Sequence, residues 1–395
     1  MNIVSYLKKN GITHTLKIIN EYKMQELFDS LVSIFTKQKE LRNSIVIECH
    51  TDFENNGGAF YDYLINNEYN KKYKIVLLLK DKLVKELPEN VDYFYLRKPS
   101  LRKSYVMSLS KFFTFDNDML RKYRKDQKHF YLTHGCFPLK STIGKITVPN
   151  YVDFVLSPSG NVDNIIVKQF GLTSKEQCLH TGFPCHDIFY SKPEPLVFLS
   201  NYDKKIIWAP TFRKGGGYNR NDSTASYPLG IPLLETLDEL ANLNTYLSQR
   251  DIALIVKLHP MQDISDLELK QFSHIKFLTN QDLNRKNTNL YQLLMNSDAL
   301  LSDYSAISYD YLHLDKPIGY VFSDLNDYKL GLSVDNVDDY IAGDKILSFN
   351  NLLHFIDNIY LEIDKNKEKR KELFNKIFEK QDGESCERLA QIMEL

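Results

Sequence analysis

The sequence predicts an α/β protein made of two doubly wound domains that face a cleft, and three observations lead to this fold class. Short apolar runs alternate with segments of helical spacing, which is typical of parallel βαβ units joined by right-handed crossovers. The chain has 395 residues, which is too many for one ordinary hydrophobic core. Residues 191–200 contain two prolines and no regular period, so they indicate the boundary between two such series.

Composition argues against several classes of protein. An apolar fraction of 43% and a charged fraction of 26% are those of a soluble globular protein. The net charge of -1 argues against a dedicated nucleic-acid binder, which would carry a basic surplus. The five cysteines form no C-x-x-C pair, so we expect neither a structural zinc site nor a disulfide framework, and a reducing cytoplasm fits. Residues 1–20 do not look like a signal peptide, and no window approaches the ~20 apolar residues of a membrane span.

The pattern of strands and helices divides the chain into four parts. We expect a helical segment at residues 1–43, a Rossmann-like domain at 44–195, a second one at 196–350, and C-terminal helices at 351–395. The expected strands are residues 44–49, 74–79, 92–96, 130–133, 153–156, 178–181, 205–209, 252–258, 299–301 and 316–321. The expected helices are residues 16–35, 59–65, 104–113, 161–170, 233–247, 289–295, 352–380 and 384–393.

The first helix has two interpretations. Residues 16–35 carry apolar side chains near one helical face, with lysines interleaved, and the favoured interpretation is a helix that packs on the first domain. The alternative is a basic amphipathic helix that lies on an anionic membrane, although its acidic residues weaken the basic face.

Asp116, Asn117 and Asp118 spell a D-x-D sequence, which binds a divalent metal in some glycosyltransferases. Here the three residues lie between apolar runs. We therefore expect them to cap a helix rather than to hold a metal ion.

Residues 299–310 predict a turn from a strand into a helix. The apolar run ends at Ser302 and Asp303, and helical spacing begins at Ser305. Such a turn exposes backbone N–H groups and the positive end of a helix dipole, which together form a natural seat for a phosphate. The alternative is that Ser305 is merely an N-cap.

Other polar residues stand where expected strands end, and ligands of open α/β sheets bind at the carboxyl ends of the strands. These groups are His134-Gly135, Gly182-Phe183-Pro184 with Asp187, Pro210-Thr211-Phe212-Arg213, and His259-Pro260. Sequences typical of a nucleophile elbow, a zincin or a P-loop are absent from the chain, which argues against those hydrolase and nucleotide-binding classes.

Each of these side chains has a catalytic or binding interpretation and a structural one. His134 is a candidate general base, with Gly135 allowing close approach of a ligand and Lys140 nearby, or else it bonds a backbone carbonyl. Arg213 is suited to bidentate phosphate binding or is an exposed loop arginine.

His259 donates to a phosphate oxygen or is structural. Asp310 holds a ribose hydroxyl or is simply exposed.

Taken together, the motifs resemble the CDP-glycerol glycerophosphotransferase family, the teichoic-acid and capsule polymerases and primases of TagF/TagB type. The matching strings occur in the family's order over residues 45–328. They are His134-Gly135 with Pro138-Leu139-Lys140, Thr181-Gly182-Phe183-Pro184 with Asp187, Ala209-Pro210-Thr211-Phe212-Arg213, Lys257-Leu258-His259-Pro260, Ser302-Asp303-Tyr304-Ser305 with Asp310, and Asp315-Lys316-Pro317-Ile318.

The resemblance implies a GT-B fold and transfer of glycerol phosphate or another polyol phosphate from CDP-glycerol or CDP-ribitol to a hydroxyl of a glycan or lipid-linked polymer, with release of CMP. It implies that His134 is the base, with Gly135, Lys140 and Asp187 on the acceptor side. The implied donor-binding residues are Thr211, Arg213, His259, Pro260, Ser302, Asp303, Ser305, Ala306 and Asp310. No metal or further cofactor and no nucleic acid is implied, and we expect a cytoplasmic protein peripheral to the cytoplasmic membrane.

The sequence departs from the family pattern at three places. The usual string H-G-T-P-L-K is H-G-C-F-P-L-K here, one residue longer, and the usual D-Y-S-S is D-Y-S-A, which leaves Ala306 with only its backbone N–H for a phosphate. Cys185 stands where the family often has an arginine. Two alternatives stay open, namely a GT-B glycosyltransferase or epimerase that uses a UDP-sugar, and a membrane-associated scaffold without turnover.

Overall fold

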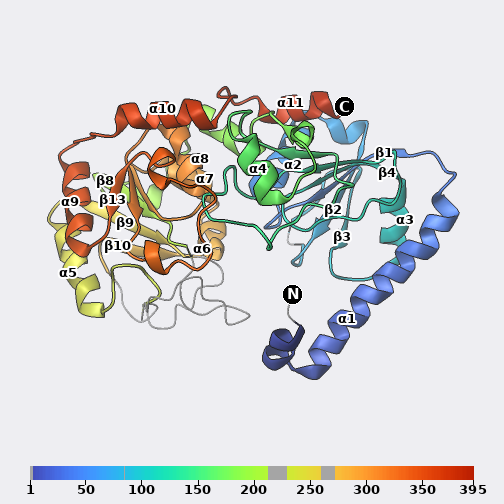
Figure 1. Cartoon of the computed structure of the whole chain (residues 1–395), viewed down its shortest axis with the longest axis horizontal. Coiled ribbons are helices and arrows are strands. Elements are labelled where there is room, and N and C mark those ends of the chain that lie inside the picture. Colours follow the sequence, from blue (N-terminus) through green and yellow to red (C-terminus); the bar gives the residue numbers. More distant parts are fainter. Residues whose placement is uncertain (1–2, 84, 212–228, 259–271) are drawn as a thin grey trace. The chain divides into compact units, whose positions relative to one another are not determined.

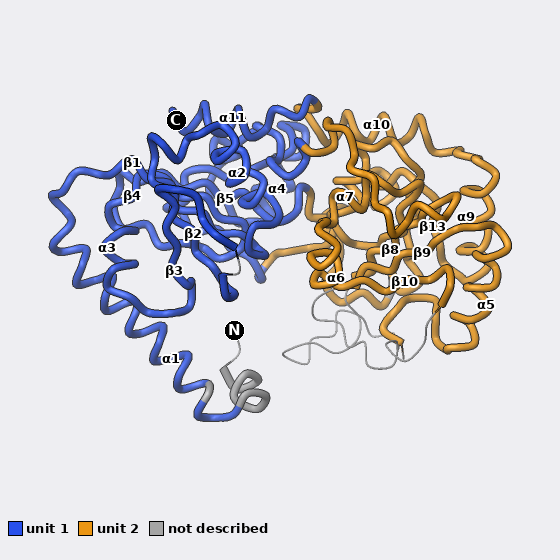
Figure 2. The backbone as a smooth tube through the Cα atoms, turned by 180° about the vertical axis from the view of Figure 1, so that it is seen from behind, with its two compact units in different colours: residues 1–136, 144–187, 382–395 blue, residues 137–143, 188–381 orange. Residues whose placement is uncertain are grey.

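The computed structural model describes residues 3–83, 85–211, 229–258 and 272–395, and the chain divides into two compact units (Figures 1 and 2). Unit 1 comprises Met1–Cys136, Gly144–Asp187 and Asp382–Leu395, and unit 2 comprises Phe137–Ile143 and Ile188–Gln381. The C-terminal residues therefore return to unit 1 after the chain has completed unit 2.

Unit 1 is built on a seven-stranded sheet with the order β3-β2-β1-β4-β5-β6-β7. All of its strand pairs are parallel. The strands are β1 (Arg42–Glu48), β2 (Lys74–Leu79), β3 (Val91–Tyr95), β4 (Ser110–Phe115), β5 (Lys128–Tyr131), β6 (Phe154–Leu156) and β7 (Cys178–Leu179). The central strands are almost continuously apolar and buried, as expected of a parallel sheet with both faces covered.

The helices of unit 1 connect or follow these strands. They are α1 (Ile3–Thr36), α2 (Asn55–Asn66), α3 (Leu101–Leu109), α4 (Asp163–Phe170) and α11 (Ser385–Ile392). Helix α1 packs along α3, and Asp29 joins the two because the hydroxyls of Ser104 and Tyr123 both donate to its carboxylate, at 2.6 and 2.9 Å. The expectation that the first helix packs on the first domain is confirmed.

Unit 2 repeats this plan with a six-stranded parallel sheet in the order β10-β9-β8-β11-β12-β13. Its strands are β8 (Lys204–Trp208), β9 (Ile252–Lys257), β10 (Ile275–Leu278), β11 (Ala299–Ser302), β12 (Ile318–Val321) and β13 (Asp344–Ile346). Its helices are α5 (Leu237–Ser248), α6 (Asn280–Arg285), α7 (Leu290–Met295), α8 (Ile307–Asp310), α9 (Phe349–Tyr360) and α10 (Lys367–Ile377). The core packs the strands against α5 and α9.

Both sheets have the strand order of a doubly wound fold, so each has a switch point where neighbouring strands lead to helices on opposite faces. The switch point of unit 1 lies between β1 and β4, and that of unit 2 lies between β8 and β11. Ligands of such sheets bind outside the carboxyl ends of the strands at this position. The predicted α/β fold with two doubly wound domains is thus confirmed.

Several element predictions were wrong. The helix expected at residues 104–113 ends at Leu109, and residues 110–115 are strand β4 because the chain passes from helix to strand without a turn. The single long helix expected at 352–380 is two helices, α9 and α10, and strands β10 and β13 were not predicted.

Asp116 begins no helix of its own. Instead its carboxylate accepts the N–H of Gly57 in the first turn of α2, at 3.0 Å from each oxygen. Asp116 therefore binds the N-terminus of a helix, as expected of a cap, but that helix is α2, which is distant in sequence.

Candidate active site

His134 follows strand β5 on a strained turn of unit 1. The residue before it, Thr133, has φ 61, a backbone conformation that a β-branched residue rarely adopts. The Thr133 hydroxyl donates to the carbonyl oxygen of Gly135 at 3.0 Å and so closes the turn over His134. His134 itself is exposed, while Thr133 is buried. Strain of this kind persists only where the surroundings fix the backbone, and it is common at catalytic sites.

Asn56, near the start of helix α2, fixes that backbone. Its amide nitrogen donates to the carbonyl oxygens of Leu132 and Thr133, both at 3.0 Å. Its amide oxygen accepts the N–H of Cys185 at 3.1 Å. One buried side chain therefore holds the His134 turn and the turn after β7 together. Sequence reasoning missed Asn56, because an asparagine in a polar loop carries no distinguishing signal.

The turn after β7 contains the predicted Gly182 and Asp187. Gly182 has φ 80, which only glycine adopts without strain. Both oxygens of the Asp187 carboxylate accept backbone N–H groups at the start of α11, from Ser385 at 2.9 Å and Cys386 at 2.8 Å. The contacts that the structure shows for Asp187 are thus those of a helix cap, and its acceptor-side role stays a prediction.

Lys140 and its neighbours lie in unit 2. Lys140 pairs with Leu332 through an isolated antiparallel bridge, and the Ser141 N–H donates to the carbonyl of Gly331. Phe137, in the longer H-G-C-F-P-L-K string, is fully buried, with its ring 4.7 Å from Tyr309 and stacked on Tyr340 at 5.5 Å, centre to centre. Phe137 of the longer string therefore packs against two tyrosine rings.

At the switch point of unit 2, Asp303 joins the ends of β11 and β8. Its buried carboxylate accepts the backbone N–H of Thr211 at 2.9 and 3.1 Å, and it also accepts the Thr211 hydroxyl. Ser302 is buried beside this pair and its hydroxyl points to the carbonyl of Ala209, at 3.5 Å. Asp303 thus fixes the backbone at Thr211.

The expected turn from strand to helix follows directly. Strand β11 ends at Ser302, and helix α8 begins at Ile307 after an N-cap at Ala306 that makes no side-chain bond. Ser305 is not the side-chain cap; its backbone carbonyl accepts the N–H and the hydroxyl of Ser308. In the part of the chain that the structure describes, the Ser305 hydroxyl has no hydrogen-bond partner, and the residue is half-buried. Asp310 is buried on the same short helix.

Arg213, His259 and Pro260 lie outside the described residues, and so does Phe212. Their roles stay predictions.

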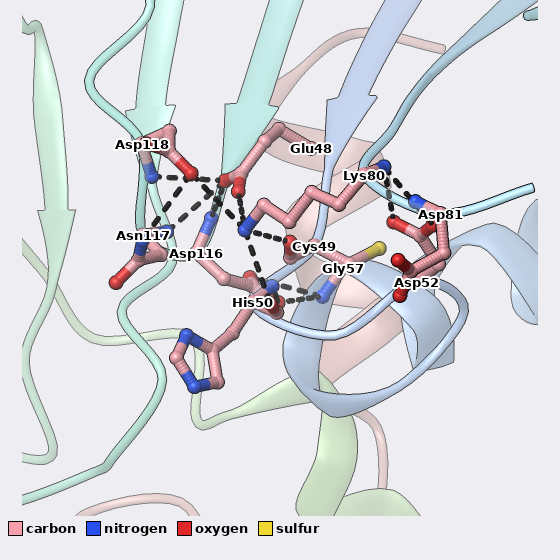
Figure 3. A network of polar contacts seen from close by, with 10 residues as sticks. All are labelled: Glu48, Cys49, His50, Asp52, Gly57, Lys80, Asp81, Asp116, Asn117 and Asp118. Carbon is pink, nitrogen blue, oxygen red and sulfur yellow. Dashed lines mark hydrogen bonds and ion pairs between the residues drawn. The ribbon is translucent and has the colours of Figure 1, made fainter. Parts of the chain in front are cut away.

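A polar network that sequence reasoning missed occupies the switch point of unit 1 (Figure 3). Glu48, at the end of β1, places one oxygen 2.5 Å from the Lys80 ammonium. Its other oxygen accepts the backbone N–H groups that follow β4, from Asp116 and Asn117 at 3.0 Å and from Asp118 at 3.3 Å. The Lys80 ammonium also contacts Asp118 at 3.1 Å.

Burial governs the electrostatics of this network. It raises the pKa of Glu48 to about 6, against the opposing effect of Lys80, and raises the pKa of Asp116 well above its usual value. Burial would also raise the pKa of Asp118, but the Lys80 ammonium outweighs it and lowers that pKa. Lys80 itself stays charged, since its acidic partners raise its pKa despite burial.

Helix α2 can approach this network closely only because its first turn contains glycine. A Cβ at Gly57 would lie 2.9 Å from the Cys49 sulfur and 3.1 Å from the Glu48 carbonyl oxygen. A Cβ at Gly58 would lie 2.3 Å from the backbone of Phe53. The N-N-G-G sequence therefore brings Asn56 within reach of the His134 turn.

Two doubly wound parallel sheets, each with polar residues at its switch point, are the architecture of the GT-B fold. A family model described as CDP-Glycerol:Poly(glycerophosphate) glycerophosphotransferase matches residues 31–395, and the chain belongs to this family. It is therefore a glycerophosphotransferase, and the resemblance stated from its motifs is confirmed.

Curated relatives agree with this assignment. The chain is 25% identical over 317 residues to a teichoic acid poly(glycerol phosphate) polymerase of Bacillus spizizenii, covering 72% of this chain and 75% of the relative. It is 28% identical over 319 residues to a teichoic acid glycerol-phosphate primase of Bacillus subtilis, covering 73% and 76%.

Solved structures support the fold. The wall teichoic acid polymerase TagF superposes with a TM-score of 0.73 at 18% identity, covering 96% of both chains. A protein assigned as a UDP-N-acetylglucosamine 2-epimerase in Listeria monocytogenes superposes less well, with a TM-score of 0.52 at 10% identity, covering 90% of this chain and 98% of that one.

Proposed function

We propose that this enzyme transfers glycerol phosphate, or a related polyol phosphate, from a CDP-activated donor to a hydroxyl of a teichoic-acid-type surface polymer and releases CMP. The main structural support for this proposal is the strained turn that presents His134 at the carboxyl end of β5. Family membership supports the donor, and a TagF variant has been solved after soaking with CDPG.

In the proposed reaction His134 takes the proton of the acceptor hydroxyl. The acceptor oxygen then forms a bond to the phosphorus of the polyol phosphate, and the bond from that phosphorus to the oxygen of CMP breaks. No covalent enzyme intermediate is needed. Catalysis of this kind depends on in-line positioning and on groups that stabilise the equatorial phosphate oxygens.

Donor binding is assigned to unit 2. Ser305 offers a half-buried hydroxyl beside the backbone N–H groups after β11, and Ala306 offers its N–H alone. Arg213 and His259 would hold the pyrophosphate and Asp310 would contact the nucleoside, while Asp303 holds the backbone of Thr211. Gly135, Lys140 and Asp187 complete the proposed acceptor side.

The first test is a screen of donors read by CMP release. Purified enzyme with a lipid-linked acceptor receives CDP-glycerol, CDP-ribitol or a UDP-sugar in parallel. CMP release from either CDP-linked donor, with incorporation of the polyol phosphate into the acceptor, supports the proposal. Consumption of the UDP-sugar without any CMP from the other two donors would show instead a GT-B enzyme of the UDP-sugar type, and inertness toward all three would indicate a scaffold.

Arg213 gives a quantitative test of the donor site. We expect Arg213→Ala to weaken donor binding by roughly 1.5–3 kcal/mol, the scale of hydrogen bonds to a charged group. Isothermal titration calorimetry with the donor measures this change, and an unaltered affinity would remove Arg213 from the site.

We also infer that the enzyme works at an anionic membrane surface, with helix α1 as its contact. In the described residues no helix is both long and apolar enough to cross a bilayer. The face of α1 that does not pack on α3 is nevertheless apolar, since Ile12, Leu16, Leu27, Leu31 and Ile34 are all exposed. Exposed Lys17 and Lys23 lie along the same helix. An apolar stripe with neighbouring cations is typical of helices that lie in the membrane interface.

Flotation with vesicles of phosphatidylglycerol and phosphatidylcholine tests this membrane role. We expect Leu27→Glu with Leu31→Glu to abolish co-flotation, because two charges would then enter the apolar stripe. The matched control is Leu347→Glu with Leu361→Glu, which changes two exposed leucines of unit 2. Equal flotation of the two double variants would exclude α1 as the contact.

A further inference from the structure

His50 lies beside His134 in unit 1. The two imidazole rings are stacked, with their centres 4.6 Å apart and their planes inclined by 19°. His50 comes from the turn after β1, whereas His134 follows β5, so the contact joins distant parts of the chain. Both residues are exposed at the carboxyl edge of the sheet, where an acceptor would bind.

The turn that carries His50 is fixed by the side chain of Lys80. Its ammonium donates to the carbonyl oxygens of Cys49 at 2.7 Å and His50 at 3.0 Å, and it pairs with Glu48 and Asp118. Four oxygens thus surround one cation, and two of them carry the negative charge of carboxylates. Figure 3 shows the His50 ring projecting away from this cage.

The far end of the turn is fixed as well. The Asp52 carboxylate accepts the backbone N–H groups of Lys80 at 3.0 Å and Asp81 at 2.9 Å. Two residues that follow, Phe53 and Asn55, have positive φ, so the chain reverses sharply into α2. A turn clamped at both ends by Lys80 and its neighbours gives the His50 ring a defined position.

We propose that His50 is a positioning residue for the base His134, and that the Lys80 cage holds it in place. This inference rests on the function proposed above, in which His134 takes the acceptor proton. When it does so, His134 becomes an imidazolium, and a neutral aromatic face stacked on that cation stabilises it. A charged partner ring at this separation would instead repel it.

The charged groups around His50 favour the neutral ring. Partial desolvation and the Lys80 ammonium, which reaches it from β2, lower the pKa of His50. The side chains of Asn117 and Asp118, which follow β4, act in the opposite direction but are outweighed. His134, after β5, is the remaining titratable neighbour in the stack.

The first experiment needs no substrate, so it is independent of the proposed reaction. The pKa of His134 is measured by NMR titration of its ring in the wild-type chain, in His50→Ala and in His50→Phe. We expect His50→Ala to lower the pKa of His134 by about 0.4–0.7 unit, and His50→Phe, which keeps a neutral ring, to restore it. An unchanged pKa of His134 in His50→Ala would overturn the inference.

The second experiment follows turnover and its pH dependence by CMP release. We expect His50→Ala to reduce kcat about two- to fivefold with the donor KM unchanged, to move the acidic limb of the pH profile, and to be rescued by His50→Phe. His354→Ala, which removes an exposed histidine of α9, is the matched control. A wild-type enzyme that releases no CMP would refute the proposed function, while the NMR result would still decide the role of His50.

The role of Lys80 is tested by a double-mutant cycle. The double variant Lys80→Met with His50→Ala should lose no more kcat than the more damaging of the two single variants, because Lys80 acts through His50. Lys80→Met with Glu48→Gln avoids leaving a buried carboxylate unpaired, and circular dichroism with thermal melting confirms folding of each variant. If the reductions in kcat of Lys80→Met and His50→Ala multiply in the double variant, Lys80 acts separately from His50. That result would overturn the proposed role of Lys80.

Discussion

The two sheets share one strand order, yet their switch points are closed by different chemistry. In unit 1 a buried network of Glu48, Lys80 and the N–H groups after β4 locks the ends of three strands. In unit 2 a single carboxylate, Asp303, clasps the backbone and hydroxyl of Thr211. The same topology therefore supplies the same location for a site, and local residues decide what the site does.

This difference agrees with the division of labour proposed for the two units. A base that removes a proton benefits from a rigid, preorganised frame, and unit 1 supplies one through Asn56, Lys80 and the strained turn at Thr133. The contact between Asp303 and Thr211 in unit 2 instead fixes the backbone at Thr211, two residues before Arg213 in the sequence. Changes around His134 in unit 1 should thus affect turnover, and changes around Thr211 in unit 2 should affect donor affinity.

The largest effect is expected from His134→Ala. Loss of a general base typically reduces kcat by about 10²- to 10⁴-fold, and CMP affinity should stay the same because the proposed donor site is formed by other residues. Turnover assays and calorimetry with CMP measure the two quantities separately. Loss of CMP binding in this variant would contradict the assignment of roles to the two units.

The buried His129 of unit 1 should make the stability of the protein depend on pH. It is fully buried, its ring stacks on Phe113 at 4.4 Å, and neither ring nitrogen has a hydrogen-bond partner among the described residues. Burial, together with nearby Lys122, lowers its pKa from 6.5 to about 3. Between these two pKa values His129 is protonated in the unfolded chain but neutral in the folded chain. The free energy of unfolding therefore decreases as pH falls from about 6.5 to 3.

The loss approaches about 1.4 kcal/mol per pH unit well below pH 6.5, and it amounts to roughly 2.3 kcal/mol between pH 6.5 and 4.5. His129→Phe should remove this part of the pH dependence and leave a flatter curve. Urea unfolding at several pH values measures the free energy of unfolding for both chains. Parallel curves would show that His129 does not titrate in this way.

The clasp of unit 2 should have a smaller effect, and one of a different kind. Asp303→Ala leaves the Thr211 N–H without its acceptor, and we expect donor affinity to fall about tenfold with kcat nearly unchanged. Glu48→Gln in unit 1 is the matched comparison, for which we expect lower kcat and unchanged CMP affinity. The reverse pattern in this pair would remove the distinction between the two switch points.

The smallest expected effect is that of Ala306→Ser. A hydroxyl at this position adds one hydrogen bond to a bound phosphate, worth about 0.5–1 kcal/mol, so the donor should bind roughly two- to fivefold more tightly. Calorimetry with the donor measures it. Weaker binding would indicate that the space beside Ala306 is already filled by the donor.

Much of the fold could be predicted because parallel strands produce apolar runs that end at polar residues. The run ending at Ser302 and the strand at residues 74–79 were placed almost as observed. Strand β4 was missed because its helix runs into it without glycine or proline, so periodicity alone could not separate them. Strand β13 was missed because its three residues are too few to form a pattern.

The candidate site was predictable only where residues bear recognised motifs. His134 and Asp303 stood at strand ends and could be named from the sequence, whereas Asn56, Lys80 and His50 could not. Their roles depend on contacts across tens of residues, such as the bond from Asn56 to Thr133. No local spacing encodes such contacts, since sheet order alone decides which strand ends become neighbours.

The cage around Lys80 has one further consequence. Its cation is tethered to the backbone, so the turn at His50 holds its shape without drawing an ion from solution. The positive charge of this turn is thus supplied by a side chain of the protein itself. Because the cation is part of the chain, the amino-acid sequence alone supplies all the groups that shape this turn.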